Sequence, residues 1–427
     1  MSKLLLVLIG LTPLLVTPQT YELFEFPKMI FVYLTASILL GHLLWKQATR
    51  KDNNLTIWQF SHVRLLWPVG LYALTFLISF TFSQNHSVSF YGYYTRFNGG
   101  LLSLAAYLTT FVFVYRNMNT EKKINALMKV ILLASVPVSL YAVGQHFGID
   151  AEYWVQNVKL RVFSTLGQPN WLAGYLLVVM PVTVWLFLYK SYKSYATYAA
   201  IVLFGLQFTA FWFTYSLSGL LGFAVLTPAF ILLNKKLVQK NPKKLALLAG
   251  VCLSVAILFP GPLGARIKEF KNVAQNKMAA YAAEEVLPAT GGDTGTIRLL
   301  VWQGSLKLWL SSPKVFLIGA GPETFAFSFL KFRLEGLNYT SEWDFLYNKA
   351  HNEYLNLLAT QGILGLSAYL GMIYWGFKKA RSAFEKALVA GIIGMSVSLF
   401  FGFHTVVTSL YLWVYLGVLY ANAKLKT

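Results

Sequence analysis

The stretch that decides the fold begins with the polar string NKAHNEY (348–354) and continues as the apolar run LNLLATQGILGLSAYLGMIYWGF (355–377). This run is long enough to cross the bilayer core, which is about 30 Å thick. Upstream lies a polar segment, residues 260–351, and apolar runs resume on its other side. The pattern predicts a membrane domain interrupted by one large polar insert, which ends at His351.

The composition is that of an integral membrane protein. Of the 427 residues, 56% are hydrophobic and 12% are charged, and the mean hydropathy is +0.55. Soluble domains carry about 25% charged residues. The single cysteine, Cys252, excludes an intrachain disulfide and a cysteine-based metal site.

Twelve apolar runs predict transmembrane helices. The first run is short enough for a signal peptide, but no small-residue cleavage site follows it, so we expect it to be retained. We predict an all-α membrane protein with nine helices in residues 1–259, a large external helical loop in residues 260–353 and three helices in residues 354–427. The predicted spans are 3–16, 28–45, 64–82, 97–115, 124–145, 169–189, 197–214, 217–234, 245–259, 355–377, 387–403 and 405–423.

The charge distribution predicts the orientation of these helices. The net charge is +20, and 22 of the 36 Lys and Arg residues, but only three of the 16 acidic residues, fall in segments on the side of the N-terminus. Positive residues accumulate on the cytoplasmic side of membrane proteins. We therefore expect cytoplasmic termini and an external insert, and we attribute the basic excess to topology rather than to nucleic-acid binding.

Local patterns divide the insert into smaller elements. Residues 263–286 predict a partly amphipathic helix, and the glycine-rich residues 290–296 predict a break. Apolar residues at helical spacing predict a second helix over 297–310. A turn is expected at 319–322, followed by a short helix over 323–332.

Five arginines are expected on the external side: Arg96, Arg161, Arg266, Arg298 and Arg333. The guanidinium group binds phosphate through two parallel hydrogen bonds and keeps its charge when partly desolvated. Such a set suits a lipid-linked diphosphate. The alternative is that these residues contact lipid headgroups or pair with external acidic residues.

His351 is the candidate general base, because an imidazole can accept a hydroxyl proton near neutral pH. Asn352 or Glu353 could orient it. A structural histidine at the start of a helix is the alternative. Asn170 follows Pro169, which suits the first turn of a helix, and its amide would bind either another helix or a ligand.

A metal-dependent reaction is a rival interpretation. Glu342 and Asp344 could hold Mg²⁺ or Mn²⁺ against a diphosphate. The other histidines lack metal-ligand spacing, and no nucleotide-binding or nucleophile-elbow motif is present in the sequence. The energy for a transfer reaction must then come from an activated substrate on the outer face.

Six strings together resemble the O-antigen ligase/polymerase superfamily. Each string is weak alone, but the His-Asn string followed by Gly-Ile-Leu-Gly is fairly specific in combination. The strings are RFNGGL (96–101), TLGQPNWLA (165–173), RLLVW (298–302), GAGPETF (319–325), KAHNEYL (349–355) and GILG (362–365).

The resemblance implies an inverting glycosyltransferase of the membrane-embedded C type in a bacterial inner membrane. Such enzymes need no metal or other cofactor and take a glycan from an undecaprenyl diphosphate carrier. His351 would be the base or a positioning group, while Arg161, Arg298 and, more weakly, Arg96 would hold the diphosphate. Further candidate substrate contacts are Asn170, Lys349 and Asn352.

The sequence departs from the family pattern at two places. Many members carry Ser-Arg where this chain has Ser216-Leu217, so one diphosphate contact is expected to be replaced or lost. Many relatives also carry Asp-Arg or Asp-Lys where this chain has Asn348-Lys349.

Several functions remain open at this point. The acceptor could be a lipid A core, as for a ligase, another repeat unit, as for a polymerase, or a protein hydroxyl, as for an O-oligosaccharyltransferase. A transporter of lipid-linked glycans is the alternative from another class. A transporter is expected to carry mid-membrane charges or repeated halves, and the sequence shows neither.

Overall fold

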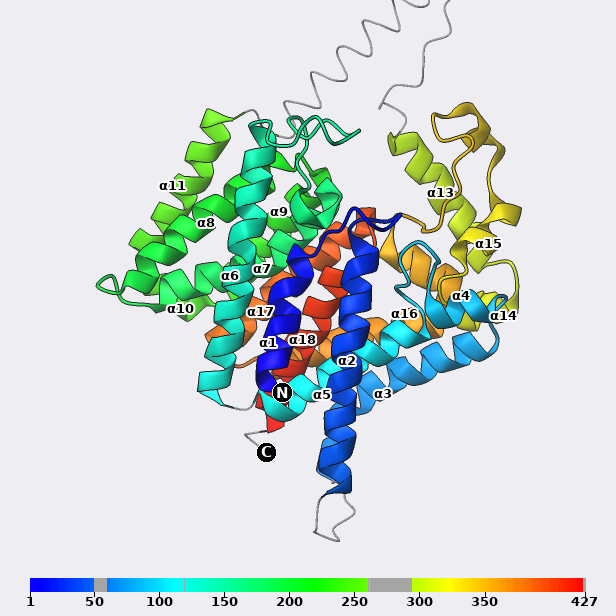
Figure 1. Cartoon of the computed structure of the whole chain (residues 1–427), viewed down its shortest axis with the longest axis horizontal. Coiled ribbons are helices and arrows are strands. Elements are labelled where there is room, and N and C mark those ends of the chain that lie inside the picture. Colours follow the sequence, from blue (N-terminus) through cyan, green and yellow to red (C-terminus); the bar gives the residue numbers. More distant parts are fainter. Residues whose placement is uncertain (50–59, 119, 260, 262–293, 425–427) are drawn as a thin grey trace, which may run out of the picture.

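The computed structural model describes residues 1–49, 60–118, 120–259, 261 and 294–424 (Figure 1). Every regular element within these residues is helical. The α-helices before the insert are α1 Ser2–Leu11, α2 Glu25–Ala48, α3 Phe60–Thr81, α4 His86–Tyr91, α5 Leu101–Asn117, α6 Glu121–His146, α7 Pro169–Tyr189, α8 Tyr195–Phe213, α9 Leu217–Leu233, α10 Lys235–Gln239 and α11 Pro242–Leu258. The later α-helices are α13 Thr294–Trp309, α14 Pro313–Ile318, α15 Phe325–Phe329, α16 Glu353–Lys379, α17 Ala383–Ser398 and α18 Val406–Lys424. Short 3-10 turns occupy Thr12–Leu14, Ser164–Leu166, Leu330–Phe332, Glu335–Tyr339 and Leu399–Phe401.

Each of the twelve predicted spans coincides with one of these helices. Among the described residues, six helices are long and apolar enough to cross a membrane: α2, α6, α7, α8, α16 and α17 with its 3-10 extension. α1, α3, α9 and α18 contain shorter apolar stretches. An all-helical membrane protein is therefore confirmed, whereas the count of twelve spans stays a prediction.

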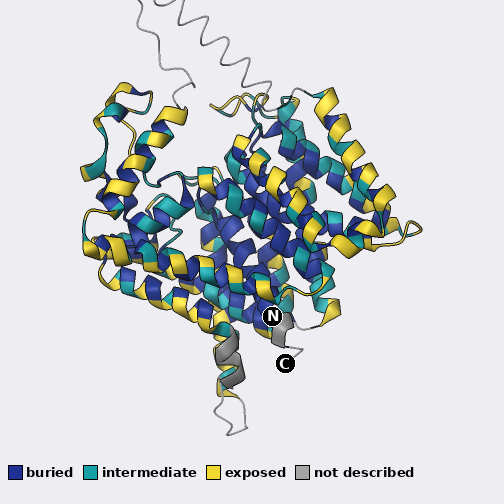
Figure 2. Ribbon diagram, turned by 180° about the vertical axis from the view of Figure 1, so that it is seen from behind, coloured by how far each residue is buried: buried dark blue, intermediate teal, exposed yellow. Residues whose placement is uncertain are grey.

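α7 is largely buried, and α17, α8 and α9 pack against it. Buried residues fill the middle of the molecule (Figure 2). Small residues allow the close approach of these helices. A β-carbon on Gly222 of α9 would lie 2.6 Å from the carbonyl oxygen of Gly394 in α17, and one on Gly391 would lie 2.8 Å from that of Val178 in α7. Such small-residue contacts are typical of helix packing in membranes.

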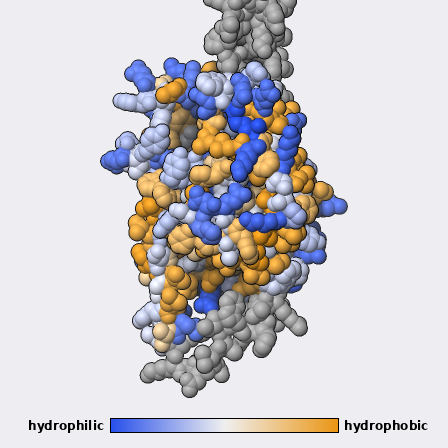
Figure 3. All heavy atoms as spheres, turned by 90° about the vertical axis from the view of Figure 1, so that its right-hand side faces the viewer, coloured by the Kyte–Doolittle hydropathy of each residue, from blue (hydrophilic) through white to orange (hydrophobic). Residues whose placement is uncertain are grey.

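The outer faces of several helices remain apolar. Leu34 of α2 is 62% exposed and Leu232 of α9 is 74% exposed. On the side of the molecule seen in Figure 3, hydrophobic residues cover much of the middle, and hydrophilic residues gather toward the top. Apolar surface of this extent suits contact with lipid.

The described part of the insert folds around its own small core. Ile297 and Val301 of α13 pack with Phe325, Phe329 and Tyr347. The helix predicted over 297–310 is confirmed as α13, and the short helix predicted over 323–332 appears as α15 with the 3-10 turn that follows it. The helix predicted over 263–286, and Arg266 within it, lie outside the described residues.

The insert meets the membrane domain at a break in α16. Gly362 has φ 68° and ψ −174°, so α16 consists of two helical parts. The carbonyl groups of Ala359 and Thr360 accept hydrogen bonds from the backbone N–H groups of Ala320 (3.0 Å) and Gly321 (2.9 Å). The turn predicted at 319–322 thus satisfies carbonyl groups that the break frees.

Candidate functional site

Phe403, in the segment between α17 and α18, is the hub of the candidate site. Its ring lies 5.6 Å from the ring of His351 and 5.9 Å from that of Trp171. The guanidinium group of Arg96 lies 4.9 Å from the same ring, and the ammonium group of Lys349 lies 6.0 Å from it. Residues far apart in the sequence therefore converge on one aromatic side chain.

His351 lies directly before the N-cap of α16, in the left-handed region with φ 51°. Burial, and then the positive charges of Arg298 and Arg96, lower the pKa of His351 to about 4. The imidazole is therefore neutral near pH 7 and can accept a proton. The same electrostatic effect places both arginines in its surroundings.

Arg96 is held between two aromatic rings. Its guanidinium carbon lies 5.1 Å from the ring of Trp171 and 4.9 Å from that of Phe403. Cation–π contacts of this kind hold the guanidinium in place without neutralising its charge. The RFNGGL and TLGQPNWLA strings, which include Arg96 and Trp171, thus meet at the site.

Arg161 belongs to a hydrogen-bond network at the start of α7. Its Nε donates to the carbonyl oxygen of Thr214 (3.2 Å), and its Nη2 donates to Oδ1 of Asn170 (3.4 Å). The hydroxyl of Ser216 donates to the same amide oxygen (2.8 Å). Asn170 and Trp171 both lie in the first turn of α7, so this turn carries one partner of Arg161 and one partner of Arg96.

Ser216, at the position where the resemblance led us to expect a replaced or lost contact, forms part of this network. Ser216 is the N-cap of α9, and its hydroxyl accepts from the N–H of Gly219 (3.0 Å). Ser216 therefore serves both to begin α9 and to hold Asn170.

Asn352 and Glu353 were candidates to orient His351. The side-chain oxygens of both residues bind backbone N–H groups elsewhere. Oδ1 of Asn352 accepts from the N–H groups of Tyr354 (3.0 Å) and Leu355 (3.1 Å), and so caps α16. Oε2 of Glu353 accepts from the backbone N–H of His404 (3.2 Å). Through these bonds the two residues fix the start of α16 and the segment that carries Phe403.

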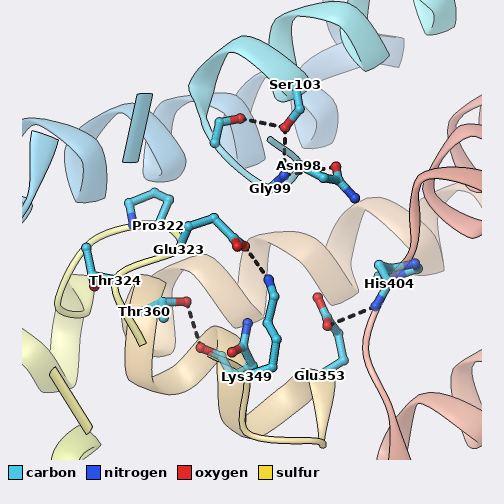
Figure 4. Close-up of polar contacts among 12 residues, drawn as sticks. Asn98, Gly99, Ser103, Pro322, Glu323, Thr324, Lys349, Glu353, Thr360 and His404 are labelled. Carbon is cyan, nitrogen blue, oxygen red and sulfur yellow. Dashed lines mark hydrogen bonds and ion pairs between the residues drawn. The ribbon is translucent and has the colours of Figure 1, made fainter. Parts of the chain in front are cut away.

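Glu323 is the main residue of the site that the sequence analysis did not select. Its carboxylate pairs with the ammonium group of Lys349, and both side chains are largely buried (Figure 4). Glu323 has φ 59°, and Gly99 leaves the space that its carboxylate occupies. Its place inside the GAGPETF string was the available signal.

Other candidates from the sequence make contacts within their own segment. Arg333 donates hydrogen bonds to Asn338 and to the backbone carbonyl of Trp343 (2.6 Å for the latter). Asp344 is exposed. Within the described ranges, no three His, Cys, Asp or Glu side chains gather as a metal site.

The fold is that of an all-helical membrane protein. Its candidate site holds a neutral histidine, His351, near Arg96 and Lys349, which both contact the ring of Phe403. Residues 199–370 match the family model described as O-antigen ligase. This match supports the resemblance to the O-antigen ligase superfamily that the sequence strings predicted. The matched range includes Arg298, Glu323, Lys349 and His351, and leaves out Arg96 and Arg161. A search of curated proteins gave no match.

Proposed function

We propose that this protein is an inverting glycosyltransferase that moves a glycan from undecaprenyl diphosphate to an acceptor hydroxyl on the outer face of the bacterial inner membrane. The observation that carries the proposal is the neutral imidazole of His351 beside the charges of Arg96 and Arg298. A general base and an anion site adjoin there. The acceptor is a lipid A core, a further repeat unit or a protein hydroxyl.

In this reaction His351 takes the proton from the acceptor hydroxyl, and the oxygen attacks the anomeric carbon of the donor sugar. The bond between that carbon and the diphosphate oxygen breaks with inversion, and undecaprenyl diphosphate leaves with the bonding electrons. Arg96 and Arg298 stabilise the negative charge that develops on the leaving oxygen. The depressed pKa of His351 fits this arrangement, because the arriving diphosphate offsets the arginine charges and favours proton uptake.

We propose that Arg161 extends the anion site. Its bonds to the carbonyl oxygen of Thr214 and to Oδ1 of Asn170 fix the guanidinium at the start of α7. We propose that Arg161 binds the diphosphate, that Asn170 positions Arg161, and that Lys349 and Asn352 support the segment that carries His351.

The decisive experiment is transfer by the purified protein in liposomes. Wild-type protein and the His351→Ala variant are given a defined lipid-diphosphate glycan with each of the three acceptor types. Gain of mass on one acceptor with the wild type, lost in His351→Ala, supports the proposal and identifies the acceptor. Transfer at the wild-type rate by His351→Ala contradicts the catalytic assignment.

A second part of this experiment, with a chelator, tests the proposal that the reaction needs no metal ion. Transfer that persists after exhaustive chelation supports it. Loss of transfer that Mn²⁺ restores moves the assignment to Glu342 and Asp344.

A further inference from the structure

A polar cavity adjoins the candidate site and has no role in the reaction proposed above. Its volume is about 80 Å³, and it lies between α3, α5, α16 and the start of α18. Lys349 forms part of its wall and also contacts Phe403, whose ring lies against His351. The cavity is thus next to the place where the reacting groups would meet.

Hydrogen-bond acceptors without partners line this cavity. Asn356 and Gln361 are 4% and 6% exposed. Within the described part of the chain, the acceptor oxygens Oδ1 of Asn356 and Oε1 of Gln361 have no hydrogen-bond partner. Nδ1 of His404 also has none, and it donates or accepts according to the tautomer that the Tyr369 bond at Nε2 selects. A buried polar atom without a partner destabilises the fold. The two amide oxygens therefore point to an occupant that donates hydrogen bonds.

The charges around the cavity disfavour an anion. Two carboxyl groups, those of Glu323 and Glu353, line the cavity with one ammonium group, that of Lys349, which pairs with Glu323. Figure 4 shows these side chains, with Asn98 and His404, around a common space. A phosphate group placed here would face the carboxyl groups, whereas Arg96 contacts the Phe403 ring that lies against His351.

Aromatic side chains complete the wall. Tyr72, Phe76 and Trp413 line the cavity, and all three are at least nine-tenths buried. Aromatic faces pack against the C–H groups of a ring, while the acceptors described above bind its hydroxyl groups. A sugar ring offers both kinds of group.

We infer that this cavity binds the hydroxyl groups of a sugar ring at the reaction centre. The inference rests on the proposed function and divides the substrate between two neighbouring regions. The arginines hold the diphosphate, and the cavity holds an uncharged sugar. The ring could belong to the donor, next to its diphosphate, or to the acceptor, next to its attacking hydroxyl, because both present the same chemistry.

The test removes one amide group at a time without changing side-chain size much. Gln361→Met and Asn356→Leu are assayed in the liposome transfer reaction. Each is expected to raise the KM for one substrate by up to about tenfold, the effect of one lost hydrogen bond. A higher KM for the donor assigns the cavity to the donor sugar, and a higher KM for the acceptor assigns it to the acceptor sugar.

Thermal stability separates this role from a structural one. Asn356→Leu is expected to keep or raise the melting temperature, because its lost acceptor oxygen had no partner. Gln361→Met also loses a side-chain hydrogen bond to Tyr72, so it is expected to lower the melting temperature by less than the loss of two buried bonds does. The control is Gln207→Met, which removes buried bonds to Ser135 (2.8 Å) and Thr183 (2.8 Å) away from the cavity. It should lower the melting temperature and leave both KM values unchanged.

A direct measurement of sugar binding tests the inference independently of the proposed function. Detergent-solubilised protein is titrated with millimolar N-acetylglucosamine and glucose, and the fluorescence of the wild type is compared with that of Trp413→Phe. A sugar-dependent change that requires Trp413 and is weakened by Gln361→Met supports the cavity even if no glycan is transferred. If the wild type is active and both cavity variants have the same KM values as the wild type, the inference is overturned and the proposed function is not. Absence of the fluorescence change together with absence of transfer overturns both.

Discussion

Gly362 of α16 lies so close to the backbone carbonyl of Leu317 that no β-carbon would fit between them. The reverse contact is equally tight, because a β-carbon on Gly319 would overlap the peptide bond between Thr360 and Gln361. Both glycines also have positive φ, 68° and 74°. The GAGPETF and GILG strings therefore form one interlocked unit that joins the insert to the membrane domain.

Gly362→Ala should destabilise the protein, because the methyl group overlaps Leu317 and the left-handed backbone adds about 1–3 kcal/mol of strain. The measurement is the melting temperature in detergent. Gly371→Ala in the same helix is the matched control, since a β-carbon there meets nothing within 4 Å. It should keep or raise the melting temperature. Equal melting temperatures for the two variants would contradict the interlock.

The decrease of kcat/KM at low pH, the acid limb of the pH profile, should follow the lowered pKa of His351. kcat/KM reports the free protein, so transfer should fall only as the pH drops toward about 4, rather than near the usual value of 6.5. Protonation removes the basic nitrogen, so the rate decreases as the pH falls.

Arg298→Gln should move this limb to higher pH, because removal of a positive charge favours the protonated imidazole. The shift is partial, since burial is the larger cause of the low pKa. Arg333→Gln is the control and should leave the limb in place, because Arg333 is bonded to Asn338 and Trp343. An unchanged limb in Arg298→Gln would argue against the electrostatic coupling.

Removal of one partner of the Glu323–Lys349 pair should destabilise the protein strongly. A buried charge left unpaired costs about 3–5 kcal/mol, and the two side chains are 6% and 12% exposed. Glu323→Gln and Lys349→Gln should each lower the melting temperature, and the double variant should lose less than the sum of the two. Lys331→Gln, at an exposed position, serves as the control. Additive losses in the double variant would show that the pair is not coupled.

Arg161→Lys should lower kcat/KM by roughly tenfold or more, since lysine cannot make the forked contacts to Thr214, Asn170 and a diphosphate together. Lys159→Arg, at an exposed neighbouring position, should have little effect. The assay is initial-rate transfer at several donor concentrations. Full activity of the Arg161→Lys variant would contradict the proposal that Arg161 binds the diphosphate.

Much of the fold could be predicted from the sequence, because apolar runs of bilayer length depend on local composition alone. All twelve predicted spans coincide with helices, and α13 was predicted from its periodicity. The motif strings also brought His351 and the arginines to attention. Gln145, which accepts from the N–H groups of Phe163 (3.2 Å) and Ser164 (2.7 Å) and fixes the loop after Arg161, gave no such signal.

The long-range partners of the site could not be predicted. Phe403 is one of 33 phenylalanines, and only the packing of α7, α16 and α18 makes it the neighbour of His351 and Arg96. Glu323 depends likewise on a turn that docks on the break in α16. Asn352, a candidate to orient His351, caps the start of α16, and Glu353, the other candidate, accepts from the backbone N–H of the distant His404.

The interlock of Gly319 and Gly362 also limits how parts of this protein can be exchanged with those of its relatives. A chimaera that takes its insert from another family member but keeps this α16 would place foreign backbone against Gly362. The turn and the broken helix should therefore be transplanted together, from α14 through residue 365. The smallest segment that can be exchanged as a unit therefore extends from the insert into the membrane domain.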